Sequence, residues 1–432
     1  MNTGMLIQEF MEIRPVARKA IGGRRRCLAV LLGWLSLLGC AEASTYPLPA
    51  AGQFLVGQLQ DTRVREGETL LDIARRYSVG LDELEEANPG VDPWLPPVGQ
   101  RVLIPSQHLL PNVPRKGIVV NLPELRLYYF PKAKAGEQRV VMTYPLGIGS
   151  EGRAIPVTLT SVIQKKIDPP WVVPASILAE HQADGDPLPK VVPPGPDNPL
   201  GRYALRLGLS SFLIHSTNHP YSVGMRISHG CLRMYPEDIE ELFGKVAVGT
   251  PVRIIDQPYK AGWQGGVLYL ETHPPLAESG YSSDTNLTPM VVALTNVVSQ
   301  RLSDHAWQAA VRVASQDSGI PTPIFAEDAK RAQAAFSHVS EMKIDRHPWM
   351  VQVGVFQDRD KAQHVKRMMQ SMNLPVEVSE AGENRLCRIL VGPFPNRKEA
   401  TDTADKISKG TGLDNFLVPQ NHTLAADCRL SN

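Results

Sequence analysis

Residues 212–233 read FLIHSTNHPYSVGMRISHGCLR and contain the most informative motif of the chain. Its first four residues, three apolar side chains followed by His215, predict a short β-strand. A strand that ends in His215 would hold the imidazole rigidly against the loop that carries Cys231. Three histidines and one cysteine fall within 17 residues of a chain that has only 11 histidines: His215, His219, His229 and Cys231. This crowding indicates a site with its own chemistry.

Three kinds of site would use these side chains. Neutral imidazoles and a thiolate are zinc ligands, but no second cysteine or nearby carboxylate completes a ligand spacing, and Gly230 places His229 and Cys231 on a tight turn. A buried cysteine with packed histidines is the structural alternative. In the third kind, Cys231 attacks as a thiolate, and a nearby histidine lowers the pKa of the thiol and takes its proton. Gly230 would then let the backbone approach a substrate and leave amide N–H groups facing an oxyanion.

Composition limits the class of protein. The chain has 432 residues, which is enough for two or three domains, with 43% hydrophobic and 21% charged residues, as in ordinary globular proteins. Its formal net charge of +1 argues against a nucleic-acid binder with a broad basic surface, so we expect no nucleic-acid partner.

Residues 1–43 have the pattern of an export signal. Arg24 to Arg26 precede an apolar run, Leu28 to Leu38, that is followed by small residues. The run is shorter than the ~20 apolar residues that span a bilayer, and no later stretch is apolar enough to do so. Two processing sites compete: Ala41-Glu42-Ala43 fits signal cleavage and a soluble product, whereas Leu37 to Cys40 is similar to a lipobox that would leave a lipidated Cys40.

Three cysteines follow this segment: Cys231, Cys387 and Cys428. An odd number in an exported chain leaves one thiol over, and that thiol is a candidate reactive group. Cys387 and Cys428 could pair, but Cys387 lies on a predicted strand face, which favours a small buried hydrophobic residue. Cys231 is therefore the cysteine that we expect to react.

Residues 61–105 predict a small module of strand, helix, helix and strand. Thr69 and Asp72 have the spacing of a helix cap, and apolar residues at helical spacing follow up to Tyr77. Leu81 begins a second helix, which Asn88-Pro89-Gly90 ends. The module resembles the LysM domain in Glu66 to Leu70, Ile73 to Tyr77, Ala87 to Pro89 and Val98 to Gln100. The resemblance implies binding of glycans that contain N-acetylglucosamine, and the alternative is a packing domain without a ligand.

Residues 347–420 contain an internal repeat. The segment from Val353 to Ala362 recurs as Val391 to Ala400, and each copy predicts a strand, a turn and a helix. Two copies give a four-stranded sheet with helices on one side. This α+β (RNP-like) pattern resembles the SPOR domain, whose members bind glycan strands stripped of stem peptides. The segment before it, residues 258–345, is weakly patterned and is interpreted as a linker with some helix.

Residues 115–257 predict a mainly-β domain with long loops. Five strand candidates share β-branched and aromatic residues: 118–121, 125–129, 140–144, 212–215 and 251–255. Pro236 opens a short helix with Ile239, Leu242 and Phe243 on one face. Much of 168–200 is proline-rich and predicts a loop.

The stretch from His215 to Cys231 resembles the L,D-transpeptidase (YkuD-type) catalytic domain, whose motif is a histidine, a gap, and Ser/Thr-His-Gly-Cys with Arg or Asn two residues on. Three further segments support the resemblance: Tyr144 to Gly149, Pro170 to Pro174 and Asn198 to Gly201. It is closest to periplasmic enzymes that carry a LysM domain and attach Braun-type outer-membrane lipoprotein to peptidoglycan.

Two departures from that pattern matter. Ile155-Pro156-Val157 stands where many relatives have a Thr-Pro-x-Gly turn, which puts the local loop shape in doubt. The SPOR-like module is missing from the lipoprotein-attaching relatives, which weakens the transfer of their acyl acceptor to this chain.

The resemblance implies a catalytic pair and its support. Cys231 is the nucleophile, His215 accepts and donates the proton, and the carbonyl of Ser216 orients the imidazole. The amides of Gly230 and Cys231 form the oxyanion site, next to Ser228.

The resemblance also implies a pocket beside that pair. His229 and Arg233 line it, and Arg233 either meets a substrate carboxylate or is a surface cation. His219 matches no motif position and is interpreted as structural. No metal and no organic cofactor is implied.

The implied reaction has two stages. Cys231 attacks the carbonyl of the L-centre of meso-diaminopimelate in a tetrapeptide stem and expels the terminal D-alanine. An amine then attacks the thioester: a second diaminopimelate, which gives a 3-3 crosslink, or a lysine of an outer-membrane lipoprotein. With water as acceptor the chain would be an L,D-carboxypeptidase. A non-catalytic wall protein of the periplasm, with peptidoglycan as its partner, is the alternative function.

Overall fold

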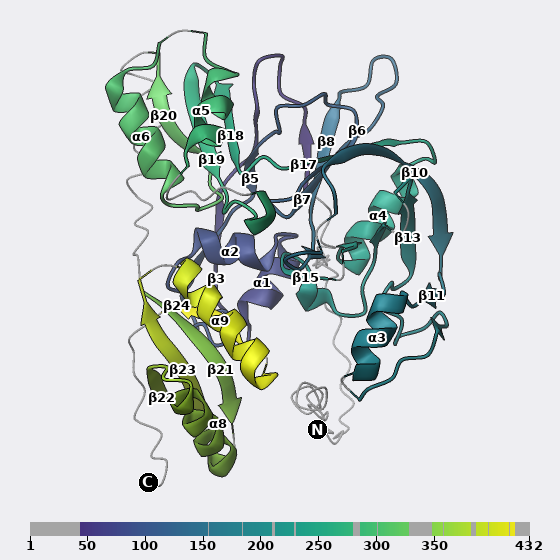
Figure 1. Cartoon of the computed structure of the whole chain (residues 1–432). Coiled ribbons are helices and arrows are strands. Elements are labelled where there is room, and N and C mark those ends of the chain that lie inside the picture. Colours follow the sequence, from purple (N-terminus) through teal and green to yellow (C-terminus); the bar gives the residue numbers. More distant parts are fainter. Residues whose placement is uncertain are drawn as a thin grey trace, which may run out of the picture. The chain divides into compact units, whose positions relative to one another are not determined.

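A computed structural model of the chain describes residues 44–153, 155–183, 185–209, 212–228, 230–279, 286–299, 301–327, 348–356, 358–381, 386–395, 397–413 and 415–419. The chain divides into two compact units, one of which contains residues 44–327 and the other residues 348–419 (Figure 1). The predicted export signal, residues 1–43, lies outside the described residues. Within the described part of the chain, no helix combines the length and the apolar character that a membrane span requires.

The LysM-like module has the predicted order of elements. Two helices lie between two antiparallel strands: β3 (Gln60–Arg63), α1 (Leu70–Arg76), α2 (Leu81–Ala87) and β4 (Arg101–Ile104). The predicted helix cap is present, since Thr69 Oγ1 accepts from Asp72 N at 3.2 Å and Asp72 Oδ2 accepts from Thr69 N at 2.9 Å. Leu70, Ile73 and Leu84 are fully buried in the core of this module.

A large curled sheet of nine strands forms the centre of the first unit, as the described residues show it. In spatial order the strands are β1 (Ser44–Pro47), β8 (Val140–Pro145), β7 (Arg126–Phe130), β6 (Gly117–Asn121), β17 (Pro251–Ile255), β10 (Thr158–Ile167), β13 (Tyr203–Leu207), β14 (Leu213–His215) and β16 (Leu232–Arg233). The five predicted strands are therefore confirmed. Helix α4 (Pro236–Lys245) packs on the sheet through Ile239 and Leu242, the face that its spacing predicts.

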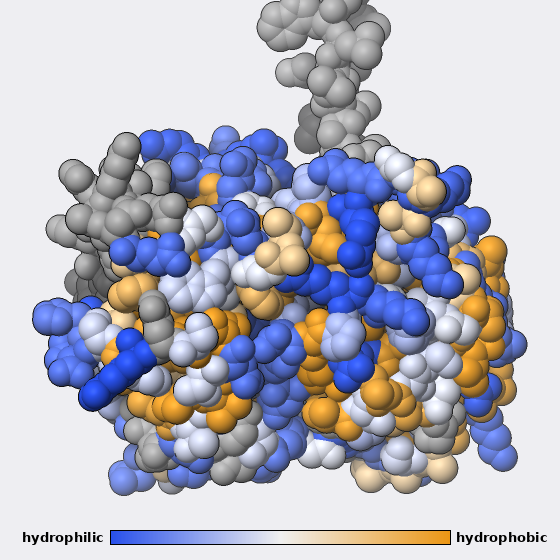
Figure 2. Space-filling view, turned by 90° about the horizontal axis from the view of Figure 1, so that it is seen from above, coloured by the Kyte–Doolittle hydropathy of each residue, from blue (hydrophilic) through white to orange (hydrophobic). Residues whose placement is uncertain are grey.

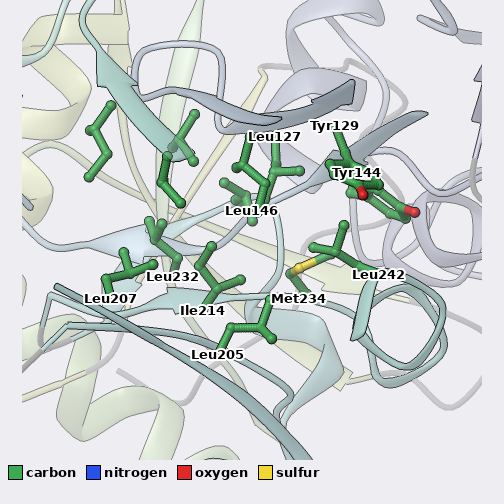
Figure 3. Close-up of a cluster of buried hydrophobic side chains, with 14 of the residues drawn as sticks. Leu127, Tyr129, Tyr144, Leu146, Leu205, Leu207, Ile214, Leu232, Met234 and Leu242 are labelled. Carbon is green, nitrogen blue, oxygen red and sulfur yellow. The ribbon is translucent and has the colours of Figure 1, made fainter. Parts of the chain in front are cut away.

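In the main core, apolar side chains from strands far apart in the sheet order pack against one another. Figure 3 shows Leu127 and Leu146, from β7 and the end of β8, meeting Leu207, Ile214 and Leu232 from β13, β14 and β16. All five side chains are fully buried. The excursion at 168–200, predicted as a loop, holds a short helix and a two-stranded ribbon: α3 (Ala175–Ala183), β11 (Trp171–Val172) and β12 (Val191–Val192).

Residues 258–345 are predicted as a linker with some helix. Helices are present, but the linker part of the prediction is wrong for the described residues between 259 and 326. They form a three-stranded antiparallel sheet with two helices: β18 (Tyr259–Gln264), β19 (Val267–Thr272), β20 (Thr322–Ala326), α5 (Thr288–Thr295) and α6 (Asp304–Ala314). Leu268, Leu270 and Leu294 are among the residues of its own core. The third strand follows the second by some fifty residues of sequence, so no local periodicity predicts this sheet.

The second unit has the predicted repeat fold. Its elements are β21 (Trp349–Phe356), α8 (Arg359–Ser371), β22 (Val376–Ala381), β23 (Leu386–Phe394), α9 (Arg397–Thr411) and β24 (Phe416–Pro419), and the sheet order is β22-β23-β21-β24. Both helices cover one face of the sheet (Figure 1).

Cys387 is buried as predicted, but it is also disulfide-bonded, so the interpretation as a simple hydrophobic residue is wrong. Cys428 lies outside the described residues.

Buried charges connect the parts of the first unit. Lys260 of β18 lies 2.7 Å from both Glu124, beside β7, and Glu271 of β19. Glu83, from α2 of the LysM-like module, pairs with Arg126 of β7. All of these side chains are almost fully buried, so the modules meet through an ion network that water does not reach.

The surface is mixed rather than segregated. On the face drawn in Figure 2, hydrophobic residues lie in separate patches between polar ones. Exposed apolar side chains occur on β10 and on the nearby ribbon: Leu159, Ile163, Ile167, Val172 and Val191.

Candidate active site

Strand pairing brings the two central site residues together. Strand β14 lies between β13 and β16, and its pairing with β16 is parallel, with Ile214 opposite Leu232 and His215 opposite Arg233. Cys231 immediately precedes β16. The backbone amide of Leu213, at the start of β14, hydrogen-bonds the Cys231 thiol. His215 therefore ends one strand, and Cys231 lies directly before the strand that pairs with it.

The imidazole of His215 is buried and fixed. Its Nδ1 lies 2.5 Å from the carbonyl oxygen of Ser216, which only accepts, so Nδ1 carries the proton of the neutral ring. Burial and the charge of Arg233 lower the pKa of His215 to about 4, although the carbonyls of Ser216 and Leu200 act against this shift. At neutral pH the ring is therefore an uncharged base.

The segment Asn198 to Gly201 supports this histidine. Asn198 is fully buried, donates from Nδ2 to the carbonyl of Pro169 at 2.9 Å, and accepts from the amide of Leu200 at 2.9 Å. Gly201 has φ +59°, and a Cβ there would lie 2.6 Å from Cβ of Ser216. This turn thus brings the carbonyl of Leu200 to the imidazole, which explains the segment singled out in the sequence.

Ser228 organises the loop that carries the cysteine. Its Oγ accepts from the amide of Gly230 at 3.1 Å and donates to the carbonyl of Cys231 at 2.7 Å. Gly230 has φ +114°, and a Cβ there would lie 3.0 Å from the carbonyl oxygen of Arg153. A side chain would therefore strain the backbone and collide with it. His229 lies outside the described residues.

The pKa of the Cys231 thiol is raised above its ordinary value. Burial raises it, and the amide of Leu213 and the charge of Arg233 oppose this only in part. Neutral His215 supplies no charge that would lower the pKa of this thiol. The described residues contain two cysteines, and Cys231 is the one that carries a thiol.

The positive charge of Arg233 acts on Cys231. Burial lowers its pKa, while Cys231 and Tyr221 raise it. Its Nε is buried without a hydrogen-bond partner, and no described carboxylate forms an ion pair with its guanidinium. Such a group is suited to bind an anion.

The structure adds residues that the sequence did not indicate. Tyr221 OH lies 3.1 Å from Nδ1 of His219, on the short helical turn η2 (Pro220–Ser222) between the two motif segments. Burial and the charge of Arg233 lower the pKa of His219, so this residue, interpreted as structural, lies near the site. Asn218 Oδ1 is buried there without a hydrogen-bond partner. The histidine was visible in the sequence, but it fits no motif spacing.

Among the described residues, the one cluster of side chains with the spacing of metal ligands lies away from this site. His108, Glu124 and Glu271 place ligand atoms within 4.8 Å of one another. The ammonium of Lys260 already lies 2.7 Å from both carboxylates, so a cation of the protein itself balances their charge.

Comparisons with known proteins identify the family of each domain. The family model YkuD, the L,D-transpeptidase catalytic domain, matches residues 115–254, the LysM domain model matches 62–105, and the SPOR domain model matches 345–419. "Probable L,D-transpeptidase YbiS" of Escherichia coli (strain K12) is 47% identical over 241 residues, which cover 55% of this chain and 77% of that protein. The chain belongs to the L,D-transpeptidase family.

Other members of the family match over longer or shorter stretches. "Probable L,D-transpeptidase YcfS" of the same organism is 41% identical over 293 residues, 66% of this chain and 89% of that protein. A solved structure, "Structure of the Ldtfm-avibactam carbamoyl enzyme", is 23% identical, covers 34% of this chain and 51% of that chain, and has a TM-score of 0.25. The predicted resemblance to the L,D-transpeptidase, LysM and SPOR families is thus confirmed.

Proposed function

We propose that this member of the L,D-transpeptidase family transfers an acyl group from a peptidoglycan stem peptide to an amine through a thioester on Cys231. One observation carries the proposal: buried His215 ends β14, Cys231 directly precedes the neighbouring strand β16, and the charge of Arg233 acts on both residues. This is the arrangement that a cysteine nucleophile requires.

The first stage moves one proton. Because burial raises the pKa of Cys231 and lowers that of His215, the resting pair is a neutral thiol and a neutral imidazole. The proton passes to His215 as Sγ bonds to the carbonyl carbon of diaminopimelate, and the carbonyl of Ser216 supports the imidazolium. The imidazolium then protonates the leaving nitrogen, and D-alanine departs as the thioester forms.

The second stage runs in reverse with a new amine. His215 takes a proton from the attacking nitrogen, the tetrahedral intermediate collapses, and Sγ leaves and is reprotonated. The oxyanion is stabilised by the amides of Gly230 and Cys231. Since the amide of Gly230 donates to Ser228 Oγ, it must exchange that bond for the substrate. Arg233, with His229 beside it, binds a carboxylate of the stem.

The flanking LysM and SPOR domains bring the catalytic domain to its peptidoglycan substrate. The LysM and SPOR domains bind peptidoglycan strands and hold the catalytic domain on the wall in the periplasm, whether residues 1–43 are cleaved or Cys40 is lipidated. The acceptor is a second diaminopimelate or a lipoprotein lysine, and with water the product is a tripeptide.

The test uses the chain without residues 1–43 and purified disaccharide tetrapeptide. We expect release of D-alanine, a carbapenem adduct on Cys231 detected by mass spectrometry, and neither of these with Cys231→Ala. D-alanine release that survives in Cys231→Ala would overturn the mechanism. A wild-type protein that binds sacculi, releases nothing and takes no adduct would be the non-catalytic wall protein.

A further inference from the structure

We infer that Glu278, which lies outside the matched catalytic domain, is a positioning residue that holds the Cys231 loop in its reactive geometry. The inference rests on the proposed function. Glu278 belongs to the short turn η3 (Ala277–Ser279), whereas the catalytic family model ends at residue 254.

Glu278 bonds two separate segments with one carboxylate. Nη2 of Arg226 donates to both of its oxygens, at 2.8 and 2.9 Å, and the amide of Gly152 donates to Oε1 at 3.0 Å. The side chains of Arg226 and Glu278 are only 25% and 29% exposed, so the pair is partly shielded from solvent. These bonds also lower the pKa of Glu278, which keeps the carboxylate charged.

Both segments touch the cysteine loop. Arg226 begins β15 (Arg226–Ser228), whose last residue is the serine that bonds Gly230 and Cys231. Gly152 lies in the turn 150–153, which donates from Ser150 to the carbonyl of Ser228 at 2.9 Å. In the same turn the carbonyl of Arg153 lies against Gly230. Glu278 therefore joins the two pieces of backbone between which Gly230 and Cys231 are held.

Glu278 is itself anchored. Leu276 is buried in the main core, Ser279 donates from its amide to the carbonyl of Leu276 at 3.0 Å, and Ser279 Oγ hydrogen-bonds Asp256. A carboxylate on an anchored turn fixes its partners more firmly than one on a free loop. Small displacements of a nucleophile cost large factors in rate, so the contact should matter for chemistry more than for stability.

The test compares Glu278→Gln with Glu237→Gln. Glu237 also pairs with an arginine, Arg75, at 2.8 and 3.1 Å and with a similar exposure of 32%, but it lies on α4 away from the cysteine loop. We expect Glu278→Gln to reduce kcat for D-alanine release and the rate of Cys231 acylation by a carbapenem about tenfold or more, with little change in KM. Glu237→Gln should keep wild-type rates, and both variants should lose similar thermal stability.

Equal acylation rates in wild type and Glu278→Gln, or equal losses in both variants, would overturn the inference. If Glu278→Gln fails to fold, Arg226→Lys replaces it, since this variant keeps the charge but loses the contact geometry, and the same slowing is expected. Wild-type protein is run first: no acylation there refutes the proposed function, whereas normal wild-type acylation with an unaffected variant refutes only the role of Glu278.

Discussion

At the scale of single residues, the chemistry depends on two groups whose pKa values burial drives apart. As the proposed base, His215 acts only above its pKa, which is about 4, and burial raises the pKa of the Cys231 thiol. In the proposed mechanism, proton transfer from Cys231 to His215 therefore accompanies attack of the sulfur on the substrate.

This predicts the pH profile of thioester formation. The rate constant for acylation of Cys231 should rise as pH increases through about 4, where His215 loses its proton, and should then stay level through neutral pH. Stopped-flow measurement with a carbapenem from pH 3.5 to 9, with circular dichroism to verify folding, tests it. An acid limb near the ordinary histidine value of about 6.5 would contradict the buried neutral base.

Arg233 supports a second residue-scale prediction. Replacing it with methionine removes the charge directed at the site, and we expect kcat/KM for the tetrapeptide to fall by about 10- to 100-fold, the worth of one charge-assisted contact. Arg202→Met is the matched control, since Arg202 is 66% exposed and lies on the surface. Steady-state kinetics of D-alanine release measure both. If kcat/KM is the same for the two variants, Arg233 has no role in binding the substrate.

At the scale of elements, helix α2 of the LysM-like module contacts the loop that leads to the cysteine. The amide of Asp82 donates to the carbonyl of Gly224 at 3.0 Å, and Met225 packs on the LysM core. Gly80 and Gly224 approach so closely that a Cβ on Gly80 would lie 2.9 Å from Cα of Gly224. The module is thus part of the catalytic scaffold as well as a separate domain in sequence.

Gly80→Ser tests this contact. Gly80 has φ −79° and caps α2, so serine suits the LysM-like module itself, but its Cβ must displace the loop at Gly224. We expect slower acylation of Cys231 with glycan binding unchanged. Gly244→Ser in α4 is the control, because nothing lies within 4 Å of a Cβ there. Unchanged acylation in Gly80→Ser would mean that the loop position does not depend on α2.

Elements with short-range signals were predicted, and those with long-range partners were not. The capping box at Thr69 and the repeat at 353–362 and 391–400 are local patterns, and both appear in the structure. The pairing of β18, β19 and β20 into one sheet is not predictable from local patterns, because the last strand lies far along the chain from its partner and each apolar segment alone is short.

At the scale of the whole first unit, the buried ion network determines how its modules join. Lys260 balances Glu124 and Glu271. Burial lowers the pKa of His273, but its carboxylate partners, Glu271 and Glu86 first among them, raise it to about 10, so a second cation lies nearby. Removing one member would leave charges without water or partners.

Lys260→Met should lower the free energy of unfolding of this unit by about 3–5 kcal/mol. Lys245→Met is the control, since Lys245 pairs with Glu241 at 3.7 Å and is 46% exposed, and exposed pairs contribute about 0–1 kcal/mol. Thermal and urea unfolding report both. A Lys260→Met protein as stable as the control would show that the network contributes nothing to stability.

Local sequence patterns were enough to predict the families of the three domains and to propose His215 and Cys231 as the central pair, because the Ser-His-Gly-Cys motif, helix caps and repeats each lie within a short stretch of chain. Only the tertiary structure decided the protonation states of His215 and Cys231, since these depend on burial among distant strands. It alone brought Glu278, Gly80 and Tyr221 to the cysteine loop and Lys260 to its two carboxylates. Desolvation and contacts between residues far apart in the chain depend on the packed molecule, so local sequence patterns do not predict them.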